Sequence, residues 1–172
     1  MSYLAPEFSR LVPLARLGSG LFRQRIEATA EERGNLAERL ELSALDRLSA
    51  EVELRRKEGG AILLEAEFEA EFEQVCAATL GPVRGALAGR FSLIYGPARD
   101  EGSEIALSGD EPAFEPLTGD VIDIGEAIAQ ELSLALPEFP RHPDASIDEF
   151  LAADPPESPF ASLARLGKRV EC

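Results

Sequence analysis

The segment from residue 64 to residue 72, LEAEFEAEF, alternates strictly between apolar residues and glutamates, and no other feature constrains the fold as much. Successive side chains of a β-strand point to opposite faces, so this period of two predicts a strand with one buried and one wet face. The glutamates at positions 65, 67, 69 and 71 would face water. A register slip of one residue would expose the phenylalanines, which restricts how the strand can pair.

A second run, residues 48–55, alternates in the same way, and Gly59-Gly60 between the two runs marks a hairpin turn. Directly opposed residues of a strand pair share a face. Leu54 must therefore face an even-numbered residue such as Leu64 or Ala66. This parity requires a loop with an odd number of residues, or a bulge, in place of a two-residue Gly-Gly turn.

Residues 21–28 and 83–95 predict two more strands, and Gly85 and Gly89 in the second could allow a bend or a bulge. Between the first two strands, residues 29–32 (TAEE) fit a capping box at the start of a helix. The sequence therefore predicts an α+β fold with a mostly antiparallel sheet and one helix between the first strands. Whether the sheet closes into a barrel stays open at this point.

The second half of the chain predicts further helices. Residues 123–126 (DIGE) are another cap signature, and Pro137 ends the apolar run that follows. Residues 146–151 and 158–166 predict two short C-terminal helices. Nothing is periodic between Tyr95 and Val121, so we expect an acidic loop at 97–120. The predicted organisation is one domain, 1–140, with a C-terminal extension, 141–172.

Negative charge is concentrated in one part of the chain. The net charge of the whole chain is −15, and residues 100–157 alone contain 16 acidic residues and a single basic one, Arg141. The remainder is balanced, so the composition predicts a neutral body with an acidic, proline-rich part attached to it. Such a field repels nucleic acid at long range and favours basic proteins as partners.

Few residues are suited to catalysis. His142 is the only histidine and lies in a Pro-Arg-His-Pro turn, where an exposed position explains it. Cys76 has no Lys, Arg or His within five residues to lower its pKa, so we expect a small buried residue. These two residues and Cys172 do not make a zinc site. We predict no catalytic residue, no metal site, no cofactor and no enzymatic activity.

Five basic residues could contact RNA directly. Arg23 and Arg25 share one face of a predicted strand, and Arg55, Arg56 and Lys57 follow one another at the predicted hairpin tip. No stretch is apolar and long enough to cross a membrane, and no signal peptide is visible, so we expect a cytoplasmic protein without a membrane partner.

Three segments resemble the bacterial YceD family. They are residues 74–83 (QVCAATLGPV) after the alternating strand, residues 121–143 from VIDIGE through LP to PRHP, and residues 158–166 (SPFASLARL). In this order and spacing the resemblance extends over about residues 7–168. The residues that we assign to the family motif are Cys76, Thr79, Leu80, Pro82, Asp123, Gly125, Glu126 and Pro137.

That family is linked to the accumulation of large-subunit ribosomal RNA. The resemblance implies a non-enzymatic factor for large-subunit biogenesis that binds a basic ribosomal protein or a precursor subunit, with direct RNA contact as the alternative. No catalytic residues are carried over. Many relatives have Cys-x-x-Cys where this chain has Cys76 and Thr79, which puts a metal-dependent form of the function in doubt here.

Overall fold

The computed structural model describes residues 7–18, 20–97 and 112–146. Most of the predicted acidic loop, the two predicted C-terminal helices and Cys172 lie outside these residues. The strands are β1 (Leu11–Pro13), β2 (Phe22–Glu27), β3 (Ala44–Arg56), β4 (Ile62–Val75), β5 (Pro82–Gly96), β6 (Ala113–Pro116) and β7 (Val121–Asp123). The helices are α1 (Ala30–Arg39), α2 (Ile124–Ala135) and the short 3-10 turns η1 (Leu14–Arg16) and η2 (Glu58–Gly60).

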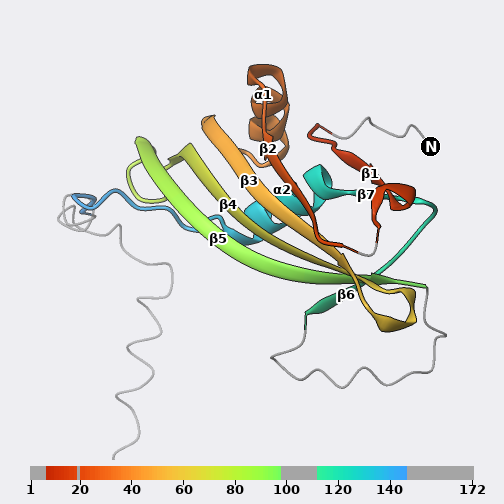
Figure 1. The fold of residues 1–172 in the computed structure, drawn as a ribbon. Coiled ribbons are helices and arrows are strands. Elements are labelled where there is room, and N and C mark those ends of the chain that lie inside the picture. Colours follow the sequence, from red (N-terminus) through yellow and green to blue (C-terminus); the bar gives the residue numbers. More distant parts are fainter. Residues whose placement is uncertain (1–6, 19, 98–111, 147–172) are drawn as a thin grey trace, which may run out of the picture.

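The main sheet has five strands in the order β2-β3-β4-β5-β6. Its pairs are antiparallel except for β5 and β6, which run parallel. Strands β1 and β7 form a separate antiparallel pair. Figure 1 shows a strongly curved sheet with α2 behind its long strands and α1 beyond one end of β2. The α+β prediction is confirmed, and the sheet stays open, with β2 and β6 at its edges within the described residues.

The β3–β4 hairpin has the register that parity requires. Leu54 pairs with Leu64, and the last pair before the turn is Arg56 with Ile62. The loop between them therefore has an odd number of residues, 57–61, and its two glycines, Gly59 and Gly60, have φ of 81° and 84°. Glycine adopts this left-handed conformation without the steric cost that other residues incur, which explains the Gly-Gly pair.

The helix between the first strands is also confirmed. The side chain of Thr29 accepts a hydrogen bond from the backbone N–H of Glu32 at 3.3 Å, and the Glu32 carboxylate accepts one from the backbone N–H of Thr29 at 2.8 Å. Two otherwise unsatisfied amides at the start of α1 are thereby paired.

One expectation about the later part of the chain is wrong. The segment between Tyr95 and Val121 contains strand β6, which sequence periodicity could not reveal because four residues are too few for a pattern. Of the two options for strand β5, a bend and a bulge, the structure shows the bend: the strand curves with the sheet (Figure 1), and its pairing with β4 runs without a register shift from Ile62–Tyr95 to Val75–Pro82. Strands β1 and β7, of three residues each, were likewise not predicted.

The core lies between the inner face of the sheet and α2. Ile122, Ile124, Ile128 and Leu132 are at most 2% exposed, and they pack with the apolar side chains of β3 and β4. The acidic region, residues 100–157, therefore supplies part of the core, and the division into a neutral body and an attached acidic part is wrong for residues 121–135. Charge counts missed this because α2 is amphipathic, with its carboxylates outside the buried stripe.

Two glycines of β5 make room for aromatic rings of β4. Gly85 pairs with Phe72, and Gly89 pairs with Phe68. A Cβ atom at position 89 would lie 2.5 Å from the Phe68 ring, and one at position 85 would lie 2.7 Å from the Phe72 ring. Phe68 also makes an edge contact with Phe91, with ring centroids 6.2 Å apart. The rings thus cover the glycine backbone, and this packing explains the glycines.

We predict that Gly89→Ala lowers the free energy of unfolding by about 1–3 kcal/mol, because the buried Phe68 ring would have to move against Phe91. Urea unfolding measures this change. Gly34→Ala is the control: its Cβ would meet nothing within 4 Å on an exposed helix position, so it should stabilise by about 0.5–1 kcal/mol. Equal effects of the two substitutions would contradict the ring-over-glycine packing.

Candidate functional site

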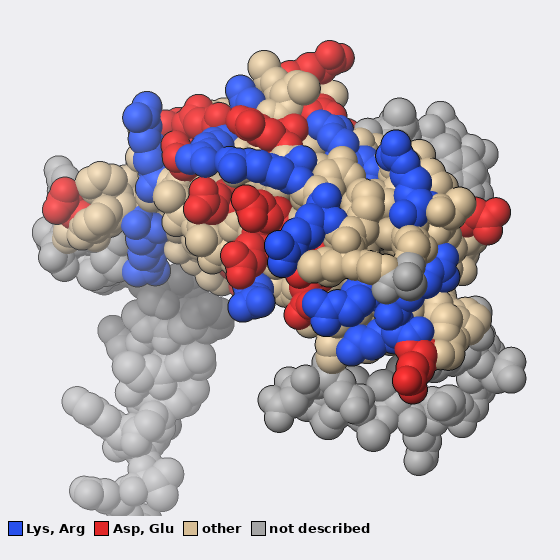
Figure 2. Space-filling view, in the orientation of Figure 1, with Lys and Arg blue, Asp and Glu red and all other residues tan. Residues whose placement is uncertain are grey.

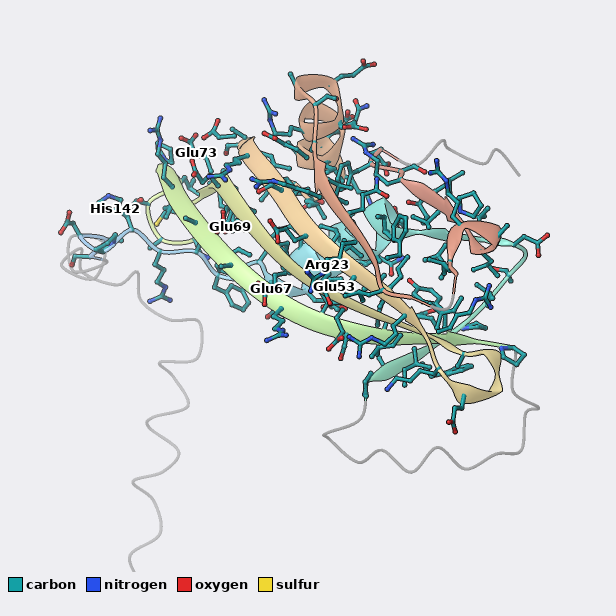
Figure 3. All side chains as sticks on the ribbon, in the orientation of Figure 1. Arg23, Glu53, Glu67, Glu69, Glu73 and His142 are labelled. Carbon is teal, nitrogen blue, oxygen red and sulfur yellow. The ribbon has the colours of Figure 1, made fainter. Side chains whose placement is uncertain are left out.

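The outer face of the sheet carries a row of glutamates from β4 between arginines of its neighbours. Arg47 of β3 lies 3.3 Å from Glu69 and 3.7 Å from Glu71. On the other side, arginines of β5 pair with Glu67 and Glu73, each at 3.5 Å. Figure 3 shows Glu67, Glu69 and Glu73 along the front of the sheet. Three arginines of the neighbouring strands thus pair with four glutamates of the row, at a gain of about 0–1 kcal/mol per exposed pair.

An open hollow of about 530 Å³ lies in the middle of this face. Its charged lining residues are Arg25, Glu51, Glu67, Glu69 and Arg90. Both signs are present and paired across neighbouring strands, so the hollow offers a charged ligand little net attraction.

The structure divides the five predicted RNA contacts into different environments. Arg23 lies 2.6 Å from Glu53, and Arg25 lies 3.8 Å from Glu51. Figure 3 shows Arg23 beside Glu53 on the outer face. These two arginines are thus ion-paired within the sheet.

The three basic residues at the hairpin tip differ from them. Arg56 donates hydrogen bonds to the backbone carbonyls of Leu17 at 3.0 Å and Leu14 at 2.9 Å. Arg55 and Lys57 are exposed and form no ion pair with a carboxylate in the part of the chain that the structure describes. The five residues therefore do not form one surface, and among them only the three at the hairpin tip have no carboxylate partner in the described ranges.

At the opposite end of β4, two of the family-like segments meet. The backbone N–H of Ala77 donates to the carbonyl of Pro140 at 2.8 Å, and the side chain of Gln74 donates to the carbonyl of Pro137 at 3.1 Å. Leu80 belongs to the β4–β5 turn and has a positive φ of 57°, and Pro82 is the first residue of β5. Figure 3 places His142 beyond this turn.

Cys76 is the centre of this junction. Its side chain is fully buried, as expected, and its sulfur accepts hydrogen bonds from the backbone N–H groups of Thr79 at 3.4 Å and His142 at 3.5 Å. The Thr79 side chain and these amides lower the pKa of the Cys76 thiol, and burial opposes them. Inspection of neighbouring charges missed this shift, because its donors are a hydroxyl, backbone amides and a residue 66 positions away.

Apolar side chains are exposed around the same junction. Leu80 is 79% exposed and Phe139 is 76% exposed. Between β5 and the segment after α2 lies a groove of about 310 Å³, lined in part by Leu87, Phe139 and Arg141. Exposed apolar residues that gather in this way are typical of protein contact surfaces.

The other family-motif residues hold the fold together. The Asp123 carboxylate caps α2 by accepting from the N–H groups of Gly125 at 3.0 Å and Glu126 at 3.2 Å. It also accepts from the backbone N–H of Arg10 at 2.8 Å and from the hydroxyl of Ser9. These bonds tie the N-terminal segment to α2.

Gly125 and Glu126 strengthen the same contact. A Cβ atom on Gly125 would lie 2.6 Å from the backbone oxygen of Phe8, so only glycine allows this approach. Glu126 pairs with Arg39 of α1 at 2.8 Å, and Arg39 also pairs with Glu7 at 3.0 Å. These residues therefore act in folding, and Asp123 and Glu126 also line an open hollow of about 320 Å³ together with residues of β6.

Arg10 extends the connection to α1 by pairing with Glu32. This hydrogen-bonded pair, together with the Thr29 backbone and hydroxyl, lowers the pKa of Glu32 to about 2, although partial burial opposes the shift. The ordinary value is 4.5. Because the folded-state pKa is depressed, the pair stabilises the protein above pH 4.5 and loses that contribution as the pH falls toward 2.

We predict that Glu32→Gln removes part of the acid sensitivity of stability. Urea midpoints measured between pH 6 and pH 2 should fall less steeply for the variant than for the unaltered protein, because Gln has no proton to gain. Glu31→Gln, one residue away on the exposed side of the same turn, should keep the original pH profile. If Glu31→Gln and Glu32→Gln flatten the profile equally, the Arg10–Glu32 pair is not the cause.

In the described part of the chain, no three His, Cys, Asp or Glu side chains are grouped so as to hold a metal ion. The absence of a metal or cofactor stays a prediction. No helix among the described residues has the length and apolar character needed to cross a bilayer.

Comparison with protein families gives one finding. The model of the family described as "Large ribosomal RNA subunit accumulation protein YceD" matches residues 64–166. Comparisons with curated proteins and with solved structures gave no match.

Proposed function

The chain belongs to the YceD family of large ribosomal RNA subunit accumulation proteins, and on that premise we propose that it is a non-enzymatic cytoplasmic factor for large-subunit biogenesis. The family match over residues 64–166 is the observation that carries this proposal. In our proposal the factor binds a basic ribosomal protein, alone or within a precursor subunit, through the acidic residues between 100 and 157.

The distribution of carboxylates supports a basic partner. Only two carboxylates in the described part of the acidic region, Asp123 and Glu126, are used to hold the fold. Four others are exposed: Glu115, Asp120, Glu138 and Asp144. None of the four pairs with Arg23 or Arg25, whose partners are glutamates of β3. The anionic surface is therefore available to a cationic partner, which such a field attracts.

The alternative, RNA binding through the arginine-bearing strands, has less support. Arg23 and Arg25 each lie within 4 Å of a β3 glutamate, so a phosphate would have to displace a carboxylate that is already in place. Exposed apolar residues such as Leu80 and Phe139 also fit a protein partner better than a phosphate backbone.

We predict that neutralising the acidic residues within 100–111 abolishes co-sedimentation with precursor large subunits. The variant carries Asp→Asn and Glu→Gln at Asp100, Glu101, Glu104, Asp110 and Glu111. These residues lie outside the described part of the structure, and the substitutions leave the capping Asp123 and the core unaltered. Deleting residues 100–157 would be a poorer test, because it removes α2 from the core.

The control makes the same change in net charge on the sheet face. It replaces five glutamates by glutamine: Glu51, Glu65, Glu67, Glu69 and Glu71. The control should still co-sediment, since exposed ion pairs add little to stability. Co-sedimentation that survives in the first variant, or is lost equally in both, would contradict the proposed role of the acidic region.

A further inference from the structure

The basic residues of the described chain fall into two classes. Seven of them form ion pairs with carboxylates: Arg10, Arg23, Arg25, Arg39, Arg47, Arg84 and Arg90. The other six bind no carboxylate within the described ranges: Arg16, Arg33, Arg55, Arg56, Lys57 and Arg141. Four of these six gather at the β3–β4 hairpin, and we call Arg16, Arg55, Arg56 and Lys57 the basic tip.

Hydrogen bonds of Arg56 bring the basic tip together. The Arg56 guanidinium donates to the carbonyls of Leu14 and Leu17, which lie on either side of Arg16 in the chain. The turn that carries Arg16 is thereby fixed against the hairpin, 39 residues away in the sequence. Arg56 is thus a positioning residue, and Arg16, Arg55 and Lys57 remain exposed around it.

The basic tip is distinct from the rest of the outer face. In Figure 2, red and blue alternate over the left and centre of this face, whereas blue predominates at the lower right, where Figure 1 places the β3–β4 hairpin. Glu58 is the one acidic residue within the hairpin loop of residues 57–61.

We propose that the basic tip is a contact site for the phosphate backbone of RNA. This inference rests on the proposed function, since ribosomal RNA is the polyanion that a large-subunit factor meets. Guanidinium and ammonium groups that hold no carboxylate can bind phosphate without first breaking an ion pair. Arg23 and Arg25 do not meet this condition, so of the five predicted RNA contacts the structure favours the three at the hairpin, together with Arg16, which the sequence did not indicate.

The large negative charge of the whole chain does not prevent such a contact. At physiological ionic strength the Debye length is about 8 Å. The hairpin loop and the β4–β5 turn are separated by the fourteen residues of β4, roughly 45 Å of strand. Charges at that distance are screened. Nearer acidic residues are Glu58 in the loop itself, Asp120, whose backbone carbonyl accepts from the N–H of Leu14 at 2.8 Å, and Glu115, which lies opposite Tyr95 of β5. Experiments on the full chain include any competition from them.

The test measures binding of transcribed large-subunit ribosomal RNA to the full chain by filter binding at several salt concentrations. The variant is Arg16→Ala, Arg55→Ala and Lys57→Ala together. We expect its Kd to rise about tenfold near 100 mM salt, and its slope of log K against log salt to become shallower by about 2–3. A charge-retaining variant, Arg16→Lys with Arg55→Lys, should bind as the unaltered chain does.

The matched control is Arg25→Ala, Arg47→Ala and Arg90→Ala together. It makes the same change in net charge but removes only ion-paired arginines, so its Kd should change less than about twofold. Equal losses in both triple variants would show that binding follows net charge and would overturn the site. Absence of RNA binding by the unaltered chain would also overturn it. A third result would also overturn the site: the Arg16, Arg55 and Lys57 triple variant binds RNA normally but no longer co-sediments with precursor large subunits. The basic tip would then contact protein.

Complementation separates this inference from the proposed function. In cells that lack the gene, the unaltered chain should restore large-subunit ribosomal RNA and the tip variant should not. If both restore it equally, the basic tip is dispensable and the inference is wrong while the function stands. If the unaltered chain restores nothing, the function is wrong, and the filter-binding result still decides whether the tip binds RNA.

Discussion

The fold depends on the partly buried carboxylate of Asp123, which accepts hydrogen bonds both from the start of α2 and from the N-terminal segment. It caps the helix through Gly125 and Glu126 and holds the N-terminal segment through Ser9 and Arg10. Arg10 in turn pairs with Glu32 at the start of α1. With Glu126 and Arg39 closing a second link between α2 and α1, both helices and the N-terminal segment are fixed relative to the sheet. An acidic sequence motif thus serves folding first.

Because Asp123 and Glu126 hold the fold together, the negative charge of the acidic region is not all available to a partner. On the sheet, arginines and glutamates pair with one another across strands, as Arg47 does with Glu69 and Glu71. Exposed carboxylates remain on the segments that flank α2, and four of the six described cations without a carboxylate partner gather at the β3–β4 hairpin, where Asp120 lies close to them through its backbone bond to Leu14. A precursor ribosome contains basic proteins and RNA together. In our proposal, the acidic region contacts the basic proteins, and the basic tip contacts the RNA.

The sequence alone predicted elements that carry a repeating pattern or a local signature. The alternation at 64–72, the parity of Leu54 with Leu64 and the Thr29 capping box all depend on neighbours in the chain, and all are confirmed. Strand β6 and the β1–β7 pair are three or four residues long, too short for any period. Other contacts join residues far apart in the sequence, and only the fold reveals them. They include the hydrogen bond from His142 to Cys76 and the bond from Arg56 to Leu17, which holds Arg16 near the hairpin.

The central claim is that α2, although it belongs to the acidic region of residues 100–157, forms one cooperative unit with the sheet. Native-state hydrogen exchange on the full chain tests it most directly. The amides of Ile128 and Leu132 should exchange only through the same opening, with the same free energy, as amides of β3 and β4. Exchange of the α2 amides at a much lower free energy, while the sheet stays protected, would show that the acidic region unfolds separately from the sheet and would contradict this account.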